Sequence, residues 1–429
     1  MLTIDKINKL IGVTESFHAS YKLMEIVNNK IEREKLFGLF LSEQQDLSFD
    51  WFTEYFQAEH SDRKGKKQDF TPDGIIRVAN GVLGTTDSNA DICAGTGGLT
   101  IKRYSENPNA SFYCEEFSDR ALPFLLFNLS IRNVDAIVCH GDSLTRDFKG
   151  IYQLIKAEKF SEIVMLKESP DIESETVIMN PPYSMSWNPE KGWIEQERFK
   201  AFEALAPKSK SDYAFLLQGL HQLKEYGVMS IILPHGVLFR GSAEGIIRKK
   251  LIEMNLLDAV IGLPAKAFLS TDIPTAVLVI KKNRTTKDIL FIDASKEFTK
   301  YASQNVLEDK HISKILDTFN GRKQIDKFSK SISFDEISEN DFNLNIPRYI
   351  DTFEPEKVES LDKIKNELAE IDIKIERSQQ ELSLMLDELV GTTPEADREI
   401  KEFAKFFSKR VNPLKNAKKA SRGEQLTLL

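Results

Sequence analysis

The sequence has few cysteines and no long apolar run. Its three cysteines, Cys93, Cys114 and Cys139, form no CxxC pair and have no histidine at a zinc-ligand spacing. We interpret them as small buried apolar residues and expect no metal site. No stretch of 18 apolar residues occurs, so no membrane-spanning helix is expected. Because the first residues also lack the basic-then-apolar plan of a secretion signal, we expect a cytoplasmic protein with no membrane partner.

The sequence also lacks an excess of positive charge. Its 58 Lys and Arg residues are outnumbered by 66 Asp and Glu residues, which gives a net charge of -8. This balance argues against a protein that coats nucleic acid over its whole surface. Basic residues gather after residue 401 and, in smaller groups, at 63–67 and 248–250. A solvated surface is the ordinary explanation for each group.

Between residues 66 and 285, short apolar runs alternate with amphipathic segments. The runs are typical of buried strands, and the segments between them have the spacing of helices. This alternation predicts an α/β fold, namely a doubly wound, Rossmann-like sheet of about seven strands. Runs 259–263 and 276–280 follow each other closely, which favours an antiparallel pair at one edge of the sheet.

The flanking regions have other patterns. Residues 1–65 have apolar positions at helical spacing and predict a small helical segment, and residues 286–352 predict a mixed extension. Residues 353–391 predict one long helix that needs an apolar partner surface, and 392–429 a short helix with a basic tail. The long helix is predicted from apolar residues in steps of three and four: Val358, Leu361, Ile364, Leu368, Ile371, Ile375, Leu382, Met385 and Leu389.

The strand-like run 177–179 ends in a stiff polar loop, Asn180-Pro181-Pro182-Tyr183. The prolines cannot donate ladder hydrogen bonds, so the strand must stop there. The Asn180 side-chain oxygen and the Pro181 carbonyl could each accept a hydrogen from a planar NH2 group, while Tyr183 stacks on the ring that carries it. In isolation the match would indicate only a proline-terminated strand. Its place at the carboxyl end of a strand, where open α/β sheets bind ligands, favours a site.

Three earlier strand ends carry glycines or acids. A strand containing Asp91 runs into Gly95, Thr96, Gly97 and Gly98 and then a helix, so backbone N–H groups can approach a ligand. The pattern D-x-x-x-G-x-G is not the full dinucleotide fingerprint and disfavours a pyrophosphate ligand. Glu116 ends the second strand, where an acid can bind ribose hydroxyls. Asp142 ends the third and could accept a hydrogen bond from an adenine amine.

Two further segments have more than one interpretation. Gln68, Asp69, Phe70, Thr71, Pro72 and Asp73 precede the predicted helix 74–80. Thr71 and Pro72 fit a helix N-cap followed by a first-turn proline, and capping alone would explain them. Phe268, between the last two strands, could face the loop beside Tyr183 or be an ordinary core residue. His140 and His235 lie near strand ends and are assigned no role.

The order of these motifs resembles the N6-adenine DNA methyltransferases with the gamma order of motifs, and more closely the modification subunits of type I restriction-modification systems. The motifs are Phe70-Thr71-Pro72, Asp91 to Gly98, Glu116, Asp142, Asn180-Pro181-Pro182-Tyr183, and Leu263-Pro264 with Phe268. The resemblance covers about residues 66–350, including Leu344-Asn345-Ile346 and Arg348-Tyr349. It implies an S-adenosylmethionine-dependent methyltransferase sheet in residues 66–285.

The resemblance also implies roles for the site residues. S-adenosylmethionine would lie over the glycine turn after Asp91, with segment 68–73 on its methionine part, Glu116 on its ribose and Asp142 on its adenine. Asn180 and Pro181 would accept the N6 hydrogens of a target adenine that has flipped out of double-stranded DNA. In the same loop Pro182 provides stiffness and Tyr183 stacks on the base, with Phe268 nearby.

The resemblance further implies partners. No target-recognition domain and no nuclease motif is recognisable, so a specificity subunit bound through the 353–391 helix would read the DNA, and a restriction subunit is a further candidate partner. The chain departs from the family in its short helical N-terminal segment and in Cys114, which replaces a common glycine. The alternatives are a solitary DNA adenine methyltransferase and an enzyme that methylates a protein glutamine or an RNA base.

Overall fold

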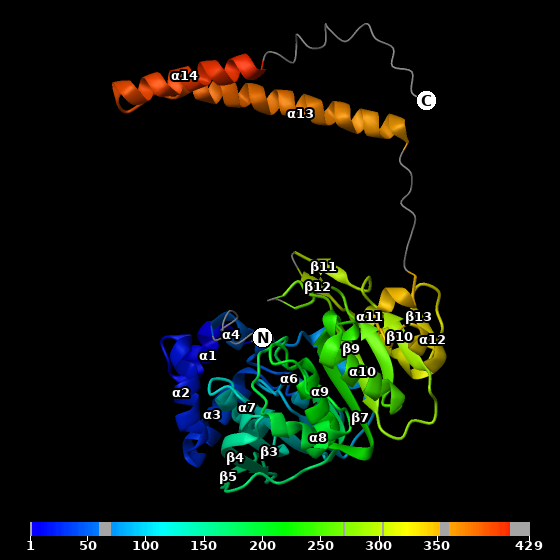
Figure 1. Ribbon diagram of the computed structural model, residues 1–429. Helices are drawn as coiled ribbons and strands as arrows, with labels where there is room; N and C mark the ends of the chain where they lie inside the picture. Colours follow the sequence, from blue (N-terminus) through cyan, green and yellow to red (C-terminus); the bar gives the residue numbers. More distant parts are fainter. Residues whose placement is uncertain (1, 60–69, 269–270, 303, 352–359, 412–429) are drawn as a thin grey trace. The chain divides into compact units, whose positions relative to one another are not determined.

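The computed structural model describes residues 2–59, 70–268, 271–302, 304–351 and 360–411. The chain divides into two compact units, Met1–Thr352 and Phe353–Leu429 (Figure 1). The first unit contains the sheet and most of the helices, and the second is a pair of helices. The finer division of the first unit at residues 65 and 285 stays a prediction.

A mixed sheet of 11 strands forms the centre of the first unit, in the order β13-β10-β8-β9-β7-β6-β1-β2-β3-β4-β5. The five neighbours from β7 to β3 are parallel, so their carboxyl ends lie at one edge. The strands are β1 (Ser88–Asp91), β2 (Ser111–Glu116), β3 (Asp135–Asp142), β4 (Asp147–Ile155), β5 (Glu162–Leu166), β6 (Ser174–Met179), β7 (Leu223–Pro234), β8 (Leu257–Gly262), β9 (Thr275–Lys281), β10 (Ile289–Asp293) and β13 (Ser329–Ile332). A separate hairpin pairs β11 (Thr299–Tyr301) with β12 (Gln304–Val306).

The α/β sheet is confirmed, and two details of the sequence prediction are wrong. The estimate of about seven strands is too low, because β4 and β5 extend one side of the sheet and β10 and β13 the other. The antiparallel pairing of β8 with β9 is confirmed, but β9 lies between β7 and β8, away from the edge. The missed strands β4 and β5 alternate charged and apolar residues or are partly exposed, so they lack the continuous apolar run of a buried parallel strand.

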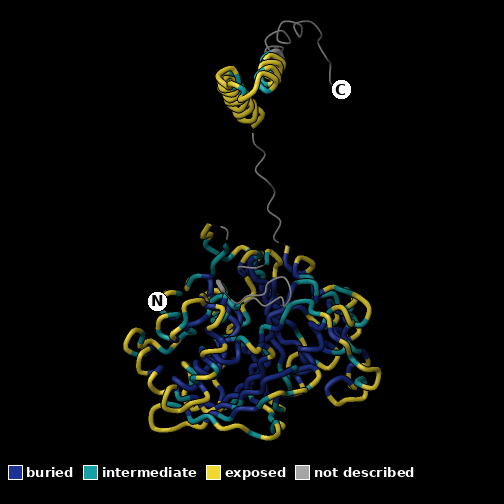
Figure 2. The backbone as a smooth tube through the Cα atoms, turned by 90° about the vertical axis from the view of Figure 1, so that its left-hand side faces the viewer, coloured by how far each residue is buried: buried dark blue, intermediate teal, exposed yellow. Residues whose placement is uncertain are grey.

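Helices cover both faces of the sheet. One face carries α8 (Glu197–Lys200), α9 (Asp212–His221) and α10 (Ser242–Glu253). The other carries α5 (Asp73–Gly81), α6 (Gly98–Glu106), α7 (Leu122–Ile131) and α11 (Asp309–Gly321). Figure 2 shows the resulting buried interior. The short helix α12 (Phe334–Glu339) and the 3-10 turns η1 (Ser16–His18), η2 (Lys191–Glu195), η3 (His235–Leu238) and η4 (Ile346–Arg348) complete the unit.

The N-terminal segment is a group of four helices that shares a core with α7. They are α1 (Ile4–Ile11), α2 (Ala19–Val27), α3 (Lys30–Glu43) and α4 (Thr53–Glu59). Phe127 of α7 lies edge-on to Phe37, Phe40 and Phe52, with ring centroids 4.8 to 5.3 Å apart. The segment is therefore an integral part of the first unit and not a separate lobe.

The second unit consists of α13 (Leu361–Glu388) and α14 (Pro394–Val411), which lie side by side. None of the 28 residues of α13 is buried. The predicted long helix is thus present from Leu361 to Glu388. Of the nine apolar residues that predicted it, here called the seam, Val358 lies outside the described residues and Leu389 follows the helix in an extended conformation. Among the described residues, no helix is long and apolar enough to cross a membrane.

Candidate active site

The four strand ends singled out in the sequence meet at one edge of the sheet. The strand order β6-β1-β2-β3 places the Asn180 loop beside the glycine turn, and Glu116 and Asp142 on the next two strands. Gly95 and Gly97 have φ angles of 58° and 101°. These left-handed conformations suit glycine and turn the chain sharply from β1 into α6. The α6 N-terminus, with its exposed partial positive charge, is therefore directed to the same edge.

Asp91 stabilises this turn from its buried side. Its side chain is fully buried, and Oδ2 accepts a hydrogen bond from the Thr100 hydroxyl of α6 at 2.8 Å. Burial raises the pKa of Asp91 to about 7, although hydrogen bonds from Thr100 and Cys93 oppose this shift. The Cys114 sulfur lies 3.6 Å from the same hydroxyl. Asp91 thus links β1 to α6 and does not expose its carboxylate at the edge.

Glu116 is tied to the glycine turn. One carboxylate oxygen accepts from the Gly95 N–H at 2.7 Å, and the other from the Ser118 N–H at 2.7 Å. Asp142 holds its own turn, since Oδ1 accepts from the N–H groups of Leu144 and Thr145 at 2.8 and 3.2 Å. Each carboxylate is therefore fixed by backbone groups at the sheet edge.

The acids create a negative environment at this edge. Burial raises the pKa of the Cys93 thiol well above its usual range, and the nearby charges of Glu116, Asp91 and Asp142 add to the shift. Cys93 follows β1 directly and is thus surrounded by the same carboxylates. Such an environment suits a ligand that carries positive charge.

The Asn180 loop is held by groups distant in sequence. The Asn180 Nδ2 donates to the Thr71 hydroxyl at 2.9 Å, and the Tyr183 hydroxyl donates to Asn180 Oδ1 at 2.7 Å. The amide therefore directs its nitrogen toward Thr71 and its oxygen toward Tyr183. The capping interpretation of Thr71 and Pro72 is wrong, because α5 begins at Asp73 with Pro72 at its N-cap and without a side-chain cap.

Aromatic side chains surround the loop and the turn. Phe268 is buried and meets Tyr183 edge-on, with ring centroids 5.8 Å apart and an interplanar angle of 87°. A Cβ added at Gly95 would lie 3.5 Å from the Phe70 ring. Phe268 and Phe70 thus limit the space at the Asn180 loop and the glycine turn, respectively. Gln68 and Asp69 lie outside the described residues.

Sequence reasoning missed a contribution from the N-terminal segment. Asp50, just before α4, accepts hydrogen bonds from the Thr96 hydroxyl of the glycine turn and from Asn128 Nδ2 of α7, the latter at 2.7 Å. Asn128 also donates to the Thr96 carbonyl at 2.8 Å. Asp50 lies 46 residues before Thr96, so no local pattern pointed to this contact.

Phe117 was missed as well. It follows Glu116 directly and is 56% exposed, which is unusual for a large aromatic side chain beside a buried strand end. An aromatic residue directly after the acid Glu116 at a strand end is the sequence signal that could have identified it. Among the described residues, no group of three His, Cys, Asp or Glu side chains could hold a metal ion.

The chain is similar to known proteins in both sequence and fold. A family model described as N-6 DNA Methylase matches residues 44–358. The Type I restriction enzyme MpnII methylase subunit of Mycoplasma pneumoniae is 32% identical over 378 residues, which are 81% of this chain and 67% of that protein.

Two solved structures are also similar. A type I restriction-modification methyltransferase subunit from Streptococcus thermophilus is 42% identical, with a TM-score of 0.58 over 66% of this chain and 59% of that one. A chain from a study of assembly and conformational transition in the type I R-M system has a TM-score of 0.51 at 17% identity, covering 91% of this chain and 73% of that one. The second likeness shows the fold alone.

Proposed function

Because the chain belongs to the N-6 DNA methylase family, we propose that it is the methyl-transferring subunit of a type I restriction-modification system. It transfers a methyl group to the N6 atom of an adenine in double-stranded DNA. The observation that carries this proposal is the orientation of Asn180, whose amide oxygen is directed toward Tyr183 by the hydrogen bond to Thr71.

The residues at the sheet edge fit S-adenosylmethionine as the cofactor. The carboxylates of Glu116 and Asp142 provide acceptors for ribose hydroxyls and an adenine amine, and the exposed Phe117 ring provides a surface for stacking. The negative environment around Cys93 suits the positive charge of the cofactor. Asp91 acts indirectly, by holding α6 against β1. When bound, the cofactor supplies an electrophilic methyl group.

The Asn180 loop addresses the main chemical difficulty, which is that the adenine N6 lone pair is delocalised into the ring. Accepting the two N6 hydrogens at Asn180 Oδ1 and the Pro181 carbonyl favours a more tetrahedral nitrogen and a more available lone pair. Oδ1 has a second lone pair and can keep its bond from Tyr183. Catalysis then rests on positioning and electrostatics.

The target adenine must leave the duplex to reach this loop. Flipping costs a few kcal/mol, and stacking on the Tyr183 ring returns about 1–3 kcal/mol. The edge-on contact with Phe268 holds the Tyr183 ring for this purpose. Tyr183 thus has two functions, because its ring stacks on the base while its hydroxyl orients Asn180.

The helix α13 supports a role for a specificity subunit. Its seam residues are exposed although they are large and apolar, as seen for Leu368, Ile371 and Ile375. A specificity subunit with a helix that covers them would supply the recognition of DNA sequence. A restriction subunit would join the same assembly, as the relatives' names suggest.

The proposal is tested by methyl transfer from labelled S-adenosylmethionine to unmethylated DNA, with the full chain alone and together with a specificity subunit. The product must be N6-methyladenine, and methylcytosine, methylglutamine or a methylated RNA base would contradict the proposal. Asn180→Ala should lower the rate by about 100- to 1,000-fold and leave cofactor affinity unchanged. Tyr183→Phe should lower the rate far less than Asn180→Ala, because it keeps the ring that stacks on the base and removes only the hydroxyl that donates to Asn180 Oδ1.

Efficient, sequence-specific methylation by the isolated chain would favour a solitary methyltransferase. We expect instead that the chain alone binds the cofactor but methylates DNA weakly and without sequence preference.

A further inference from the structure

The exit of the Asn180 loop has a backbone conformation that its sequence does not favour. Ser184 follows Tyr183 directly and has a φ of 50°, in the left-handed region that side chains other than glycine seldom adopt. Its N–H donates to Asp212 Oδ1 at 2.7 Å. A residue in this conformation persists where surrounding contacts hold it, so Asp212 stabilises the bend immediately after Tyr183.

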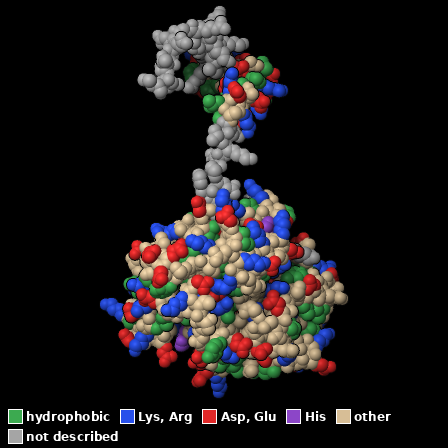
Figure 3. All heavy atoms as spheres, turned by 90° about the vertical axis from the view of Figure 1, so that its right-hand side faces the viewer, with side chains coloured by type: hydrophobic (Ala, Val, Ile, Leu, Met, Phe, Trp, Pro, Cys, Tyr) green, Lys and Arg blue, Asp and Glu red, His purple; other side chains and the backbone are tan. Residues whose placement is uncertain are grey.

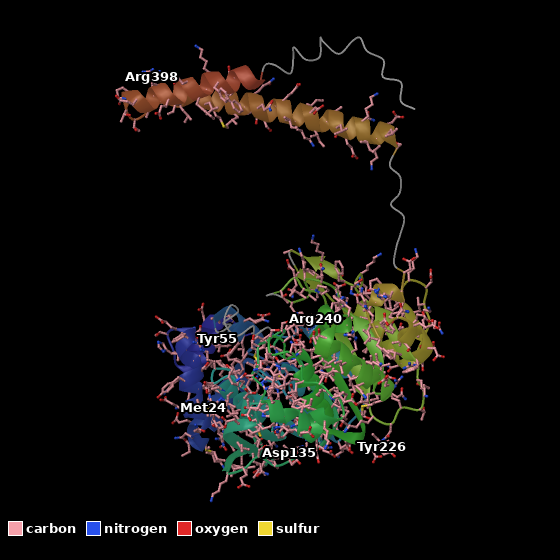
Figure 4. The ribbon with its side chains drawn as sticks, in the orientation of Figure 1. Met24, Tyr55, Asp135, Tyr226, Arg240 and Arg398 are labelled. Atoms are coloured by element: carbon pink, nitrogen blue, oxygen red, sulfur yellow. The ribbon has the colours of Figure 1, made fainter. Side chains whose placement is uncertain are left out.

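Asp212 is itself part of a chain of charged groups in which Asp212 and Glu244 are buried and Arg240 is 20% exposed. Asp212 is the first residue of α9 and is fully buried, and Oδ2 accepts from Arg240 Nη2 at 2.6 Å. Arg240 also donates to both oxygens of Glu244 on α10, at 2.6 and 2.8 Å. Figure 4 shows Arg240 in the upper part of the first unit, with Asp135 and Tyr226 near its lower side. The bend after Tyr183 is thereby linked to two helices on one face of the sheet.

Backbone hydrogen bonds hold the same segment at two further places. Ser211 donates its N–H to the Met185 carbonyl at 2.9 Å, and Trp187 donates its N–H to the Lys208 carbonyl at 2.9 Å. Trp187 also donates its ring N–H to the Pro207 carbonyl at 3.0 Å. Residues 184–187 thus lie along residues 207–212, and the Asp212 side chain bonds Ser184, directly after Tyr183.

We propose that Asp212 and Arg240 are positioning residues that set the direction of the Asn180 loop for methyl transfer. The inference rests on the proposed function. A buried ion pair is a weak source of stability, because desolvation opposes the attraction between its charges. Its geometric effect is direct, since Asp212 bonds the residue next to Tyr183. A displacement of about 1 Å at reacting groups can reduce a rate by about 100-fold.

A matched control lies at the opposite edge of the same sheet. Asp258, at the start of β8, is also buried and pairs with Arg284 and Arg322 at 3.1 Å and with Lys281 at 2.8 Å. It resembles Asp212 in chemistry and burial, but it lies at the amino end of its strand. A purely structural role would give Asp212 and Asp258 the same behaviour.

The experiment compares Asp212→Asn and Arg240→Gln with Asp258→Asn in the full chain, together with a specificity subunit. We expect single-turnover methyl transfer at saturating cofactor and DNA to fall by about 100-fold in the first two variants and to stay within about twofold in the third. Cofactor affinity should be unchanged in all three. Amide hydrogen exchange of residues 183–187 should accelerate in Asp212→Asn and Arg240→Gln and stay unchanged in Asp258→Asn.

Equal rate losses in Asp212→Asn and Asp258→Asn at equal losses of melting temperature would overturn the inference. Unchanged exchange at residues 183–187 in the Asp212 and Arg240 variants would also overturn it. If Asp212→Asn does not fold, Arg240→Gln decides, because it keeps the carboxylate and a neutral donor. Absence of methyl transfer by the wild-type chain would contradict the proposed function, whereas the exchange result would still decide the role of Asp212.

Discussion

The two units of the chain differ in how far they bury their apolar side chains. In the first unit the strands β8 and β9 are buried along almost their whole length. In the second unit α13 exposes most of its large apolar residues, for example Leu361 at 84% and Ile364 at 39% (Figure 2). Fully burying one large apolar side chain stabilises by about 1.5–3 kcal/mol. The comparison shows that the first unit has a buried core, whereas α13 leaves apolar area exposed. Under the proposed function, a specificity subunit covers this area.

The polar residues differ in the same way. In the first unit buried groups such as Asp91 and Asp212 make specific hydrogen bonds at the sheet edge. On α13 the ion pairs are exposed and local, as between Arg377 and Glu381 at 3.0 Å, and such pairs contribute little. Figure 3 shows acidic and basic side chains interspersed over one face. The first unit thus has specific buried hydrogen bonds, whereas α13 has exposed apolar side chains and local ion pairs.

The largest expected effect, on the affinity of the second unit for a specificity subunit, comes from charges placed on the seam. Leu368→Glu with Ile375→Glu should weaken the complex with a specificity subunit by more than about 100-fold, because two carboxylates would have to be desolvated. Cofactor binding by the first unit should be unaffected. Asn366→Glu with Gln380→Glu adds the same charge on the opposite side of α13 and should leave the complex intact. Size-exclusion chromatography measures complex formation, and calorimetry measures cofactor binding. A complex that survives the seam charges would contradict the role of α13.

A smaller effect is expected for the cofactor contact in the first unit. Glu116→Gln keeps the shape of the side chain but removes its charge, so S-adenosylmethionine affinity should fall by about 10- to 100-fold. Partner binding through α13 should not change. Glu175→Gln is the control, because Glu175 accepts the Asp87 N–H at 3.0 Å at the other end of the sheet. Calorimetric titration of the two variants decides, and equal affinities would mean that the ribose assignment is wrong.

A third effect, confined to the first unit, concerns its pH dependence. Asp91 keeps its proton up to about pH 7 in the folded protein, whereas an unfolded Asp loses it near pH 4. Unfolding therefore releases a proton between these values, and this contribution to stability is lost as pH rises, by at most about 1.4 kcal/mol per pH unit. Asp91→Asn should flatten the melting temperature of the first unit between pH 4 and 7. A difference between variant and wild type that does not vary with pH would contradict the raised pKa of Asp91.

The local features of the molecule were predictable from the sequence. Pro181 and Pro182 end β6 because they lack ladder donors, and the glycines after Asp91 turn the chain because they accept positive φ. The helix from Leu361 to Glu388 follows from the helical periodicity of its apolar residues. In each case the residues that determine the structure are close together in the chain, so their pattern is visible in the sequence.

Only the tertiary structure decided how these features combine. The sequence could not reveal that β6 lies beside β1, that Thr71 bonds Asn180 and does not cap α5, or that Asp50 holds Thr96. Nor could it show that Asp212 holds the bend at Ser184. The partners in these contacts are separated by 28 to 109 residues, and a hydroxyl or carboxylate has many possible partners at such separations. Close packing of the sheet and its helices selects one, because a buried polar group must find a partner within hydrogen-bonding distance.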